Sequence, residues 1–375
     1  MKIGILTFWW SEDNYGQQLQ AYALQRYLRD AGHDAFLIRY NHENEKGSPL
    51  WKKCIKALNF VKLVKVLKNK IRRAKVNIEQ SKNDRKFSDF RKDFINFSET
   101  YYNSYDELKQ NPPDADCYIV GSDQVWNPYC IGGEKSYSFE NSVNSYFLNF
   151  GSENIKRISY AASWGTTTIS KRVENLVVPL LKRFDFVSVR EESGIELCKQ
   201  CGFQNAEWVC DPTLLLKAVD YRKIYRNQNI RKQNRTFLLL YMLNNEFKYD
   251  IQKVYDFAET KNLQVVYVTG NGVVDNRQKF FATIPEWLYL VDNAEYVITN
   301  SFHCGVFSTI FGTKFGVIPL CGVHTGMNAR FDSLFKLRGI EQRFLTDDFS
   351  VVEKEFVAKN VKVSEKFLEE LNLVH

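Results

Sequence analysis

The sequence predicts an α/β protein in which two Rossmann-like domains face each other across a cleft. Three observations favour this fold. The chain opens with a strand, a glycine-bearing loop, a helix and a second strand; the alternation pauses in a polar, basic stretch at residues 217–235; and it then resumes. Such alternation indicates parallel sheets, and 375 residues provide room for two cores. We expect an N-terminal domain at residues 1–216 and a C-terminal domain at residues 217–375.

The first domain begins with a predicted strand at Lys2–Phe8, a helix at Gln17–Ala31 and a strand at Ala35–Tyr40. The first loop carries one glycine, Gly16, where a dinucleotide-binding fingerprint would have three, so we do not expect a nicotinamide cofactor. Further strands are predicted at Asp116–Val120, Arg157–Ala161, Phe186–Val189 and Glu207–Val209, and a helix at Lys171–Arg183.

A basic helical insertion at about residues 50–100 interrupts this alternation. Residues 51–75 contain ten Lys or Arg and no acidic residue. Their apolar positions recur every three or four residues, which predicts an amphipathic helix with a cationic polar face. Two interpretations stay open, a solvated surface helix and a helix that rests on an anionic membrane surface. Residues 77–100 are expected to continue as a polar helix or loop.

The second domain repeats the α/β alternation. Strands are predicted at Phe237–Tyr241, Gln264–Val268, Tyr296–Thr299 and Phe315–Ile318, and helices at Glu246–Thr260, Pro285–Asn293, Cys304–Phe311, Asn328–Arg338 and Val363–Leu373. Two such halves with facing strand ends are typical of the GT-B fold, in which we expect the last helix to cross back to the first domain.

Polar residues follow several predicted strands at their carboxyl ends, which is where open parallel sheets bind ligands. His303 lies in the turn between a strand and a helix N-terminus, a position that favours anions. Ser122 and Asp123 follow a second strand, and Arg190 follows a third. Each also has a plainer interpretation: a turn histidine, an aspartate-capped turn, and an arginine paired with a neighbouring carboxylate.

Composition narrows the possible classes of protein. The formal charge is +7, and no apolar run is long enough to span a membrane. The N-terminus lacks the basic region and cleavage site of a signal peptide, so we expect a cytoplasmic protein with eight reduced cysteines. Cys198 and Cys201 form a CxxC pair without a second pair, and we therefore expect no metal site. We also expect no nucleic-acid partner.

Six short segments, in this order and spacing, resemble the polysaccharide pyruvyl transferase family. They are Asn14-Tyr-Gly16 with LQAYALQRYL, Gly121-Ser-Asp-Gln-Val-Trp126, Ile158–Gly165, Ser188-Val-Arg190-Glu191, Asp211-Pro-Thr and Thr299-Asn-Ser-Phe-His303. The resemblance implies a GT-B-like fold and the transfer of pyruvate from phosphoenolpyruvate onto two sugar hydroxyls as a cyclic ketal. It implies no cofactor beyond phosphoenolpyruvate as the donor substrate.

Two features depart from the family pattern. The family's Arg-x-His is replaced by Ser301-Phe302-His303, which keeps the histidine and loses a cation. The first loop also lacks the acidic residue expected after Gly16. Another cation should replace the missing arginine, and the candidates are Arg190, Arg330 and His324.

The resemblance and the strand-end positions together give a set of expected site residues. We expect His303 and Asp123 to be catalytic. The expected donor-binding residues are Ser301, Asn300, Cys304, Gly305, Arg190, His324 and Arg330, and the expected acceptor-binding residues are Asn14, Tyr15, Gly16, Gln17, Ser122, Trp126 and Ser163. The expected acceptor is a sugar or lipid-linked oligosaccharide, held by an enzyme that rests through residues 51–75 on the inner face of the membrane.

Three other functions remain open. A GT-B glycosyltransferase that uses a nucleotide sugar would need a nucleotide pocket in the second domain, to which Tyr267, Trp287 and Asp292 could contribute. A non-catalytic carbohydrate-binding protein would tolerate replacement of His303. A thiol hydrolase that uses Cys304 is the most distant alternative, since no separate base is evident.

Overall fold

A computed structural model describes residues 1–45, 83–245, 247–270, 273, 275–346, 348–360 and 363–370 of the chain. The basic tract at residues 51–75 lies outside these described residues. Within the described residues, no helix combines the length and apolar character needed to cross a membrane. In the same part of the chain, no cluster of His, Cys, Asp or Glu side chains is arranged to hold a metal ion.

The first half of the chain forms a seven-stranded sheet, in which every neighbouring pair of strands is parallel. The strand order is β3-β2-β1-β4-β5-β6-β7. The strands are β1 (Lys2–Leu6), β2 (Asp34–Tyr40), β3 (Phe97–Tyr102), β4 (Cys117–Val120), β5 (Lys156–Ala162), β6 (Phe186–Val189) and β7 (Glu207–Trp208). The helices are α1 (Tyr15–Asp30), α4 (Phe87–Phe94), α5 (Tyr105–Gln110), α6 (Phe139–Tyr146), α7 (Lys171–Leu181) and α8 (Glu192–Gln200), with short 3-10 helices η1 (His42–Asn44) and η3 (Pro212–Leu215).

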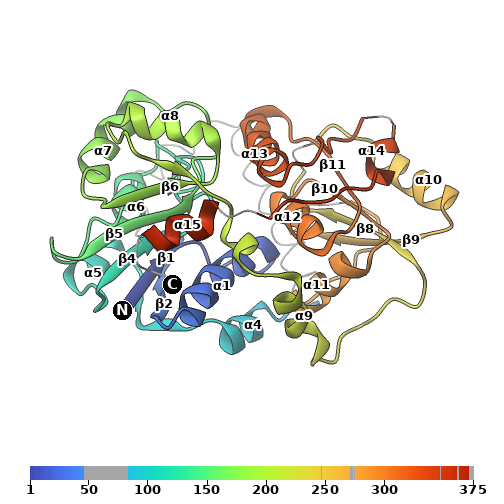
Figure 1. The fold of residues 1–375 in the computed structure, drawn as a ribbon, viewed down its shortest axis with the longest axis horizontal. Coiled ribbons are helices and arrows are strands. Elements are labelled where there is room, and N and C mark those ends of the chain that lie inside the picture. Colours follow the sequence, from blue (N-terminus) through green and yellow to red (C-terminus); the bar gives the residue numbers. More distant parts are fainter. Residues whose placement is uncertain are drawn as a thin grey trace, which may run out of the picture.

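The second half forms a four-stranded parallel sheet with the order β11-β10-β8-β9. Its strands are β8 (Phe237–Met242), β9 (Gln264–Thr269), β10 (Tyr296–Thr299) and β11 (Phe315–Val317). The accompanying helices are α9 (Ala218–Arg226), α10 (Gln252–Thr260), α11 (Ile284–Asn293), α12 (Phe302–Phe311), η4 (Gly322–Asn328), α13 (Ala329–Arg338) and α14 (Ser350–Glu353). The two α/β halves lie side by side (Figure 1), so the predicted fold class is confirmed.

Each sheet reverses its strand order at one point, and such a switch point opens a crevice beyond the strands' carboxyl ends. In the first sheet the reversal lies between β1 and β4, and in the second it lies between β8 and β10. The loop that leads to Gly16 follows β1, Ser122 and Asp123 follow β4, and His303 follows β10. The topology therefore places these predicted site residues beside the two switch points.

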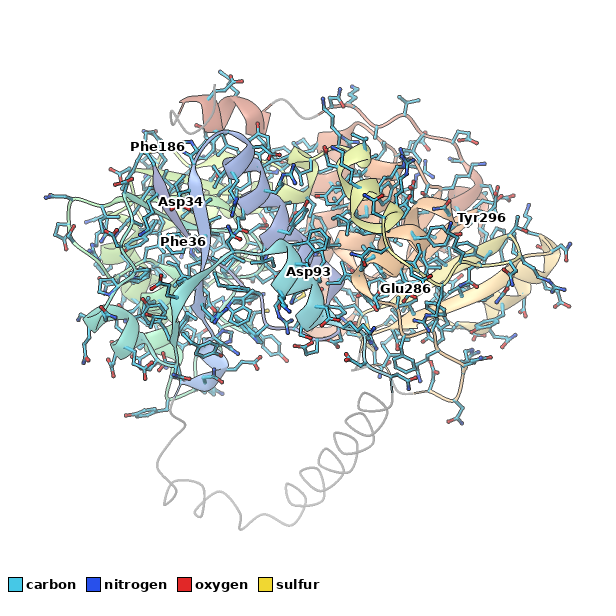
Figure 2. The ribbon with its side chains drawn as sticks, turned by 90° about the horizontal axis from the view of Figure 1, so that it is seen from below. Asp34, Phe36, Asp93, Phe186, Glu286 and Tyr296 are labelled. Carbon is cyan, nitrogen blue, oxygen red and sulfur yellow. The ribbon has the colours of Figure 1, made fainter. Side chains whose placement is uncertain are left out.

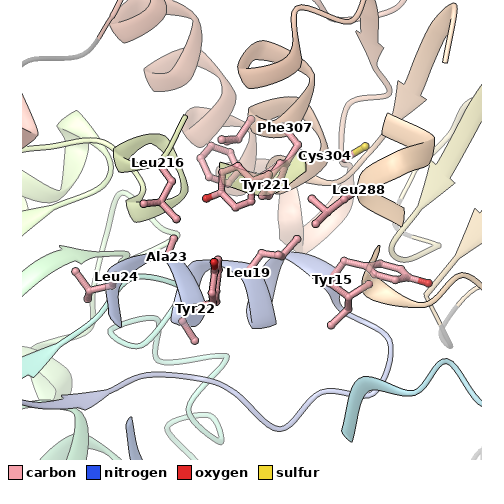
Figure 3. Packing of buried hydrophobic residues seen from close by; sticks show 14 of the residues in the cluster. Tyr15, Leu19, Tyr22, Ala23, Leu24, Leu216, Tyr221, Leu288, Cys304 and Phe307 are labelled. Atoms are coloured by element: carbon pink, nitrogen blue, oxygen red, sulfur yellow. The ribbon is translucent and has the colours of Figure 1, made fainter. Parts of the chain in front are cut away.

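Helix α1 belongs to the first half but joins both halves into one hydrophobic core (Figure 3). Its Leu19 and Ala23 face Tyr221 of α9 and Phe307 of α12. At the N-terminal end of α1, Tyr15 stacks on Trp287 of α11, with ring centroids 5.1 Å apart and planes 6° from parallel. This apolar packing fixes the two sheets relative to each other.

Two other segments connect the halves. Helix α15 (Val363–Glu370) returns to the first half (Figure 1), where Ser364 Oγ accepts a hydrogen bond from the Cys210 backbone N–H at 2.8 Å. The predicted boundary at residues 216 and 217 lies between β7 and β8. Asp93 of α4 and Glu286 of α11 lie near the junction of the halves (Figure 2), and both line a hollow of about 480 Å³.

Three predicted elements were wrong in part. Residues 97–102, predicted as polar helix or loop up to residue 100, form β3, which lies at the edge of the sheet and leaves polar side chains in solvent. The presumed link at residues 217–235 contains α9, because Tyr221, Ile224 and Tyr225 bury one face. The helix predicted at Glu246–Thr260 begins only at Gln252.

The buried His42 imidazole gives the fold a pH dependence. It contacts the rings of Phe8 and Trp10 and lies 3.0 Å from Tyr146 Oη, and burial lowers the pKa of His42 to about 4. The unfolded chain therefore takes up a proton below its ordinary pKa of about 6.5, before the folded protein does. Stability should fall as the pH is lowered through that window.

From about pH 7 to pH 5, the free energy of unfolding should fall by about 2 kcal/mol more in the wild type than in His42→Phe. Urea unfolding of both proteins at the two pH values measures this difference. An equal loss in the two proteins would contradict the assignment.

Candidate active site

The carboxyl ends of three strands share a buried network around Asp211. Arg190, directly after β6, donates from Nη1 to Asp211 Oδ2 at 2.8 Å. Ser122, after β4, donates to the same oxygen at 3.0 Å. Thr213 donates its N–H and hydroxyl to Oδ1 at 3.0 and 2.7 Å. All four residues are buried, so the network ties β4, β6 and β7 together without access to bulk water.

Neighbouring charges keep this network ionised. Burial favours the neutral form of Asp211, but the His303 imidazole and the Arg190 guanidinium hold the pKa of its carboxyl well below its usual range. Burial alone would lower the pKa of Arg190, whereas the carboxylates of Asp211, Glu191 and Asp123 raise it above its ordinary value. Arg190 and Asp211 are therefore both charged at neutral pH.

His303 reaches this network from the second half of the chain. It is the second residue of α12, and its Nε2 lies 3.3 Å from Asp211 Oδ2, in a contact that lacks hydrogen-bond geometry. Gly16 lies directly against it: a β-carbon at Gly16 would overlap the ring and the β-carbon of His303. Glycine is thus required at position 16, the second residue of α1, by the close approach of the imidazole.

Two arginine guanidiniums lie near the ring of Phe302, the residue before His303. The guanidinium carbon of Arg190 lies 4.7 Å from the ring centroid and that of Arg330 lies 5.5 Å from it. Arg330 is buried and donates from Nε to the Met327 carbonyl at 3.1 Å. Burial and the nearby charge of Arg190 lower the pKa of Arg330 to about 10, which leaves it protonated at neutral pH.

Several buried polar atoms of this cluster have no hydrogen-bond partner among the described residues. They are Nε and Nη2 of Arg190, Oε2 of Glu191 and Nε2 of His303. Ser301, the N-cap of α12, makes no capping hydrogen bond, which leaves that helix's first N–H groups uncapped by its side chain. An unpaired buried polar group costs about 1–3 kcal/mol. A ligand that offers acceptor oxygens would satisfy the guanidinium, imidazole and helix groups together.

Asp123 lies beside the same cations on a strained turn. Its φ is 72°, in the left-handed region, and the turn is held by hydrogen bonds from Ser163 N to its carbonyl at 3.0 Å and from Gln124 N to its Oδ1 at 2.9 Å. Its charge favours the protonated forms of Arg190 and Arg330. Ser163 in turn donates its hydroxyl to Glu191.

Four other predicted site residues mainly hold the fold. The Tyr15 hydroxyl donates to the Ala282 carbonyl at 2.7 Å, in addition to the stacking on Trp287. Trp126 stacks on Phe147 inside the hydrophobic core of the first half of the chain. Cys304 is fully buried, which raises the pKa of its thiol to about 12. Gly305 packs closely against Phe331. The burial of Cys304 removes the physical basis for a thiol hydrolase.

Three further predicted site residues hold loops or helix ends, and the side chain of a fourth is not described. Asn300 accepts from Leu243 N at 2.8 Å and donates to the Asn244 carbonyl at 3.0 Å, which holds the loop after β8. Asn14 caps α1 by accepting from Gln17 N at 3.2 Å, and the Gln17 side chain accepts from Ser11 N at 2.7 Å. His324 lies in η4, and its side chain is outside the described part of the structure.

Sequence reasoning left three members of the cluster out of the predicted site: Asp211, Glu191 and Phe302. Asp211 shares the signal that identified Asp123, because it too follows a predicted strand. It contributes to the sequence prediction only as part of the Asp211-Pro-Thr segment. The role of Phe302 depends on two arginines far apart in the chain, and no local pattern indicates it.

A cavity of about 570 Å³ opens beside the network, between the loops after β4 and β5 and the end of η4. Its wall includes Met327, whose carbonyl accepts the hydrogen bond from Arg330. A larger groove of about 1190 Å³ follows the edge strand β3. Neither hollow is lined by a residue of the Asp211 network, but the smaller one has a wall residue, Met327, that is hydrogen-bonded to Arg330. The smaller cavity is therefore the one that accompanies the candidate site.

Comparisons with known proteins identify the family and the fold. A family model described as polysaccharide pyruvyl transferase matches residues 14–321. The structure is similar to that of UDP-GlcNAc 2-epimerase from Methanocaldococcus jannaschii in complex with UDP-GlcNAc and UDP, with a TM-score of 0.54, 13% identity and 99% of each chain covered. A second structure of that epimerase gives a TM-score of 0.52, 11% identity and the same coverage. At such identities the likeness shows the two-domain GT-B fold alone. No curated protein sequence is significantly similar to this chain.

Proposed function

Because the chain belongs to the polysaccharide pyruvyl transferase family, we propose that it moves pyruvate from phosphoenolpyruvate onto two hydroxyls of a sugar as a cyclic ketal. The observation that carries the proposal is the buried pair Arg190 and Arg330 beside Phe302 and His303, in which Nε and Nη2 of Arg190 and Nε2 of His303 have no hydrogen-bond partner among the described residues. Phosphoenolpyruvate carries a phosphate and a carboxylate, and it would offer oxygens to these groups.

The same pair supplies the cation that the family pattern lacks. Ser301 stands at the arginine position of the Arg-x-His pattern that the family resemblance implies, and both guanidiniums lie over Phe302, the next residue. Arg190 and Arg330 thus approach α12 from other elements and take the place of the missing side chain. Arg330 is the better candidate for the donor phosphate, because Arg190 already pairs with Asp211 at 2.8 Å.

In the proposed reaction His303 donates a proton to the methylene carbon of the donor or contacts its phosphate. The bond from the enol carbon to the phosphate oxygen breaks, and two bonds form from that carbon to the sugar oxygens. The two hydroxyl protons end on the new methyl group and on the released phosphate. Asp123 orients or deprotonates the acceptor, and the Asp211 carboxylate positions the imidazole.

A nucleotide-sugar glycosyltransferase has less support from the side chains named for it. Trp287 is stacked on Tyr15, Asp292 is held by two hydrogen bonds from Arg222 at 2.8 and 2.7 Å, and Tyr267 donates to Asp275 at 2.8 Å. Each of the three is already engaged within the protein.

The proposed acceptor is a lipid-linked or polysaccharide-repeat glycan at the inner face of the membrane, with residues 51–75 near the lipid.

The proposed reaction can be tested with purified protein, phosphoenolpyruvate and a panel of glycans. Phosphate should be released only with an acceptor, and the glycan should gain the mass of pyruvate less one water. His303→Gln, which keeps a polar side chain of similar reach, should abolish both signals. Phosphate release without a change in glycan mass would indicate hydrolysis and contradict the proposal, as would full activity of His303→Gln.

A further inference from the structure

We propose that the cavity of about 570 Å³ beside the network is the acceptor subsite, and that it takes a neutral, polyhydroxylated glycosyl unit. This inference rests on the proposed function and specifies its acceptor. The volume lies within the usual range of small-molecule pockets. The subsite lies apart from the positions first expected to contact the acceptor, such as Tyr15 and Trp126, which are buried in the cores.

The side chains that line the cavity suit sugar hydroxyls. Thr167 and Thr168 contribute hydroxyls that can donate and accept hydrogen bonds. The Asn127 amide and the Thr166 and Ser170 hydroxyls also line the cavity, and each keeps a lone pair beside the hydrogen bonds that it already makes within the protein. Tyr129 adds an aromatic ring that is 67% exposed. An exposed aromatic face beside hydrogen-bonding groups matches a pyranose ring, which presents C–H groups on its faces and hydroxyls at its rim.

The charge of the lining selects against anionic ligands. Among the described residues that line the cavity none is Lys, Arg or His, and the one charged side chain is Glu134. Glu134 already accepts from Ser170 at 2.6 Å. The nearby Arg172 is engaged with the Glu134 carbonyl and lies 5.7 Å from the Phe139 ring. A nucleotide diphosphate would find no cation among these lining residues, whereas a neutral sugar needs none.

Two hydrogen bonds connect the cavity wall to residues next to Asp123 and at Arg330. On one side, Asn127 donates to Gln124, next to Asp123, at 2.8 Å. Gly165 has a φ of 56°, and a β-carbon there would lie 2.6 Å from the Asn127 amide nitrogen. On the other side, Met327 bonds to Arg330. A glycosyl unit in the cavity is thus held between the turn that carries Asp123 and the helix that carries Arg330.

Tyr129→Ala and Tyr137→Ala form a matched pair for the test, because Tyr137 is 66% exposed and does not line the cavity. The probes are the methyl glycosides of glucose, galactose, mannose and N-acetylmannosamine, followed by saturation-transfer NMR. We expect Tyr129→Ala to weaken the best-bound glycoside about tenfold and Tyr137→Ala to leave it unchanged. The thermal shift with phosphoenolpyruvate should be the same in both variants and the wild type.

Equal glycoside binding by Tyr129→Ala and the wild type would overturn the acceptor subsite, and so would binding of none of the neutral glycosides. Tighter binding of a glucuronide than of every neutral glycoside would overturn the neutral class. A wild type that binds glycosides through Tyr129 but is not stabilised by phosphoenolpyruvate would leave the sugar site standing and remove the pyruvyl-transfer function. The failures of the two proposals are therefore distinguishable.

Discussion

Gly16→Ala should destabilise the protein and abolish the proposed pyruvyl transfer. Alanine in place of glycine within a helix normally stabilises by about 0.5–1 kcal/mol. Here the added methyl would overlap the imidazole of His303 in the packed joint between the two halves, where overpacking costs about 1–3 kcal/mol. The structure therefore predicts that Gly16→Ala lowers the free energy of unfolding, the opposite of the usual effect of this substitution in a helix. Urea unfolding measures this change, and activity is measured in parallel.

A double-mutant comparison isolates the cause. The overlap includes the β-carbon of His303, so Gly16→Ala should remain costly in a His303→Ala background and lose its cost in a His303→Gly background. If Gly16→Ala stabilises the wild type, or costs the same in both backgrounds, the close approach of Gly16 and His303 is refuted.

Asp211→Ala should be the most destabilising of the carboxylate replacements. The substitution removes the hydrogen-bond partner of Arg190 and leaves a buried guanidinium charge, for which about 3–5 kcal/mol is typical. Asp292→Ala is the matched control: Asp292 pairs with Arg222, whose side chain is 31% exposed, so water can replace the lost partner. Its cost should be clearly smaller, and equal costs would contradict the assigned network.

Asp211→Asn adds a test by pH. The carboxyl of Asp211 has a pKa well below its usual range in the folded protein, so its charge contributes stability above its unfolded pKa of about 4. That contribution declines as the pH falls below this value, toward the folded pKa. The stability advantage of the wild type over Asp211→Asn should therefore shrink in acid, and a constant difference between neutral and acidic pH would contradict this interpretation.

The strands that position the site are predictable because they are apolar and buried on both faces. Residues 117–120 and 296–299 show such runs, and each is followed by polar turn residues, so Asp123 and His303 could be placed at strand ends. Strand β3 lacks such an apolar run, because it lies at the edge of the sheet, pairs with one neighbour and has the largely polar sequence FSETYY.

Contacts between the halves could not be derived in the same way. Tyr15 adjoins a loop glycine, which suggested an acceptor contact, yet its ring completes the core against Trp287 of a distant helix. Asp211 contacts His303, and Arg330 contacts the neighbouring Phe302, although these residues come from elements far apart in the chain. Local sequence patterns indicate which residues lie at the carboxyl end of a strand. Whether such a residue contacts a ligand or packs in the core depends on the helix or strand that lies against it, which the local pattern does not give.

The most direct test of the central claim is a thermal-shift titration with phosphoenolpyruvate, with UDP-GlcNAc as the comparator, on the wild type and Arg330→Gln. A ligand that binds only the folded state stabilises it by about 2.7 kcal/mol at one hundred times Kd. The arrangement of Arg190, Arg330 and His303 predicts that phosphoenolpyruvate raises the melting temperature of the wild type, that Arg330→Gln weakens this shift, and that UDP-GlcNAc has no effect. A shift with UDP-GlcNAc alone, or a phosphoenolpyruvate shift unchanged in Arg330→Gln, would contradict it.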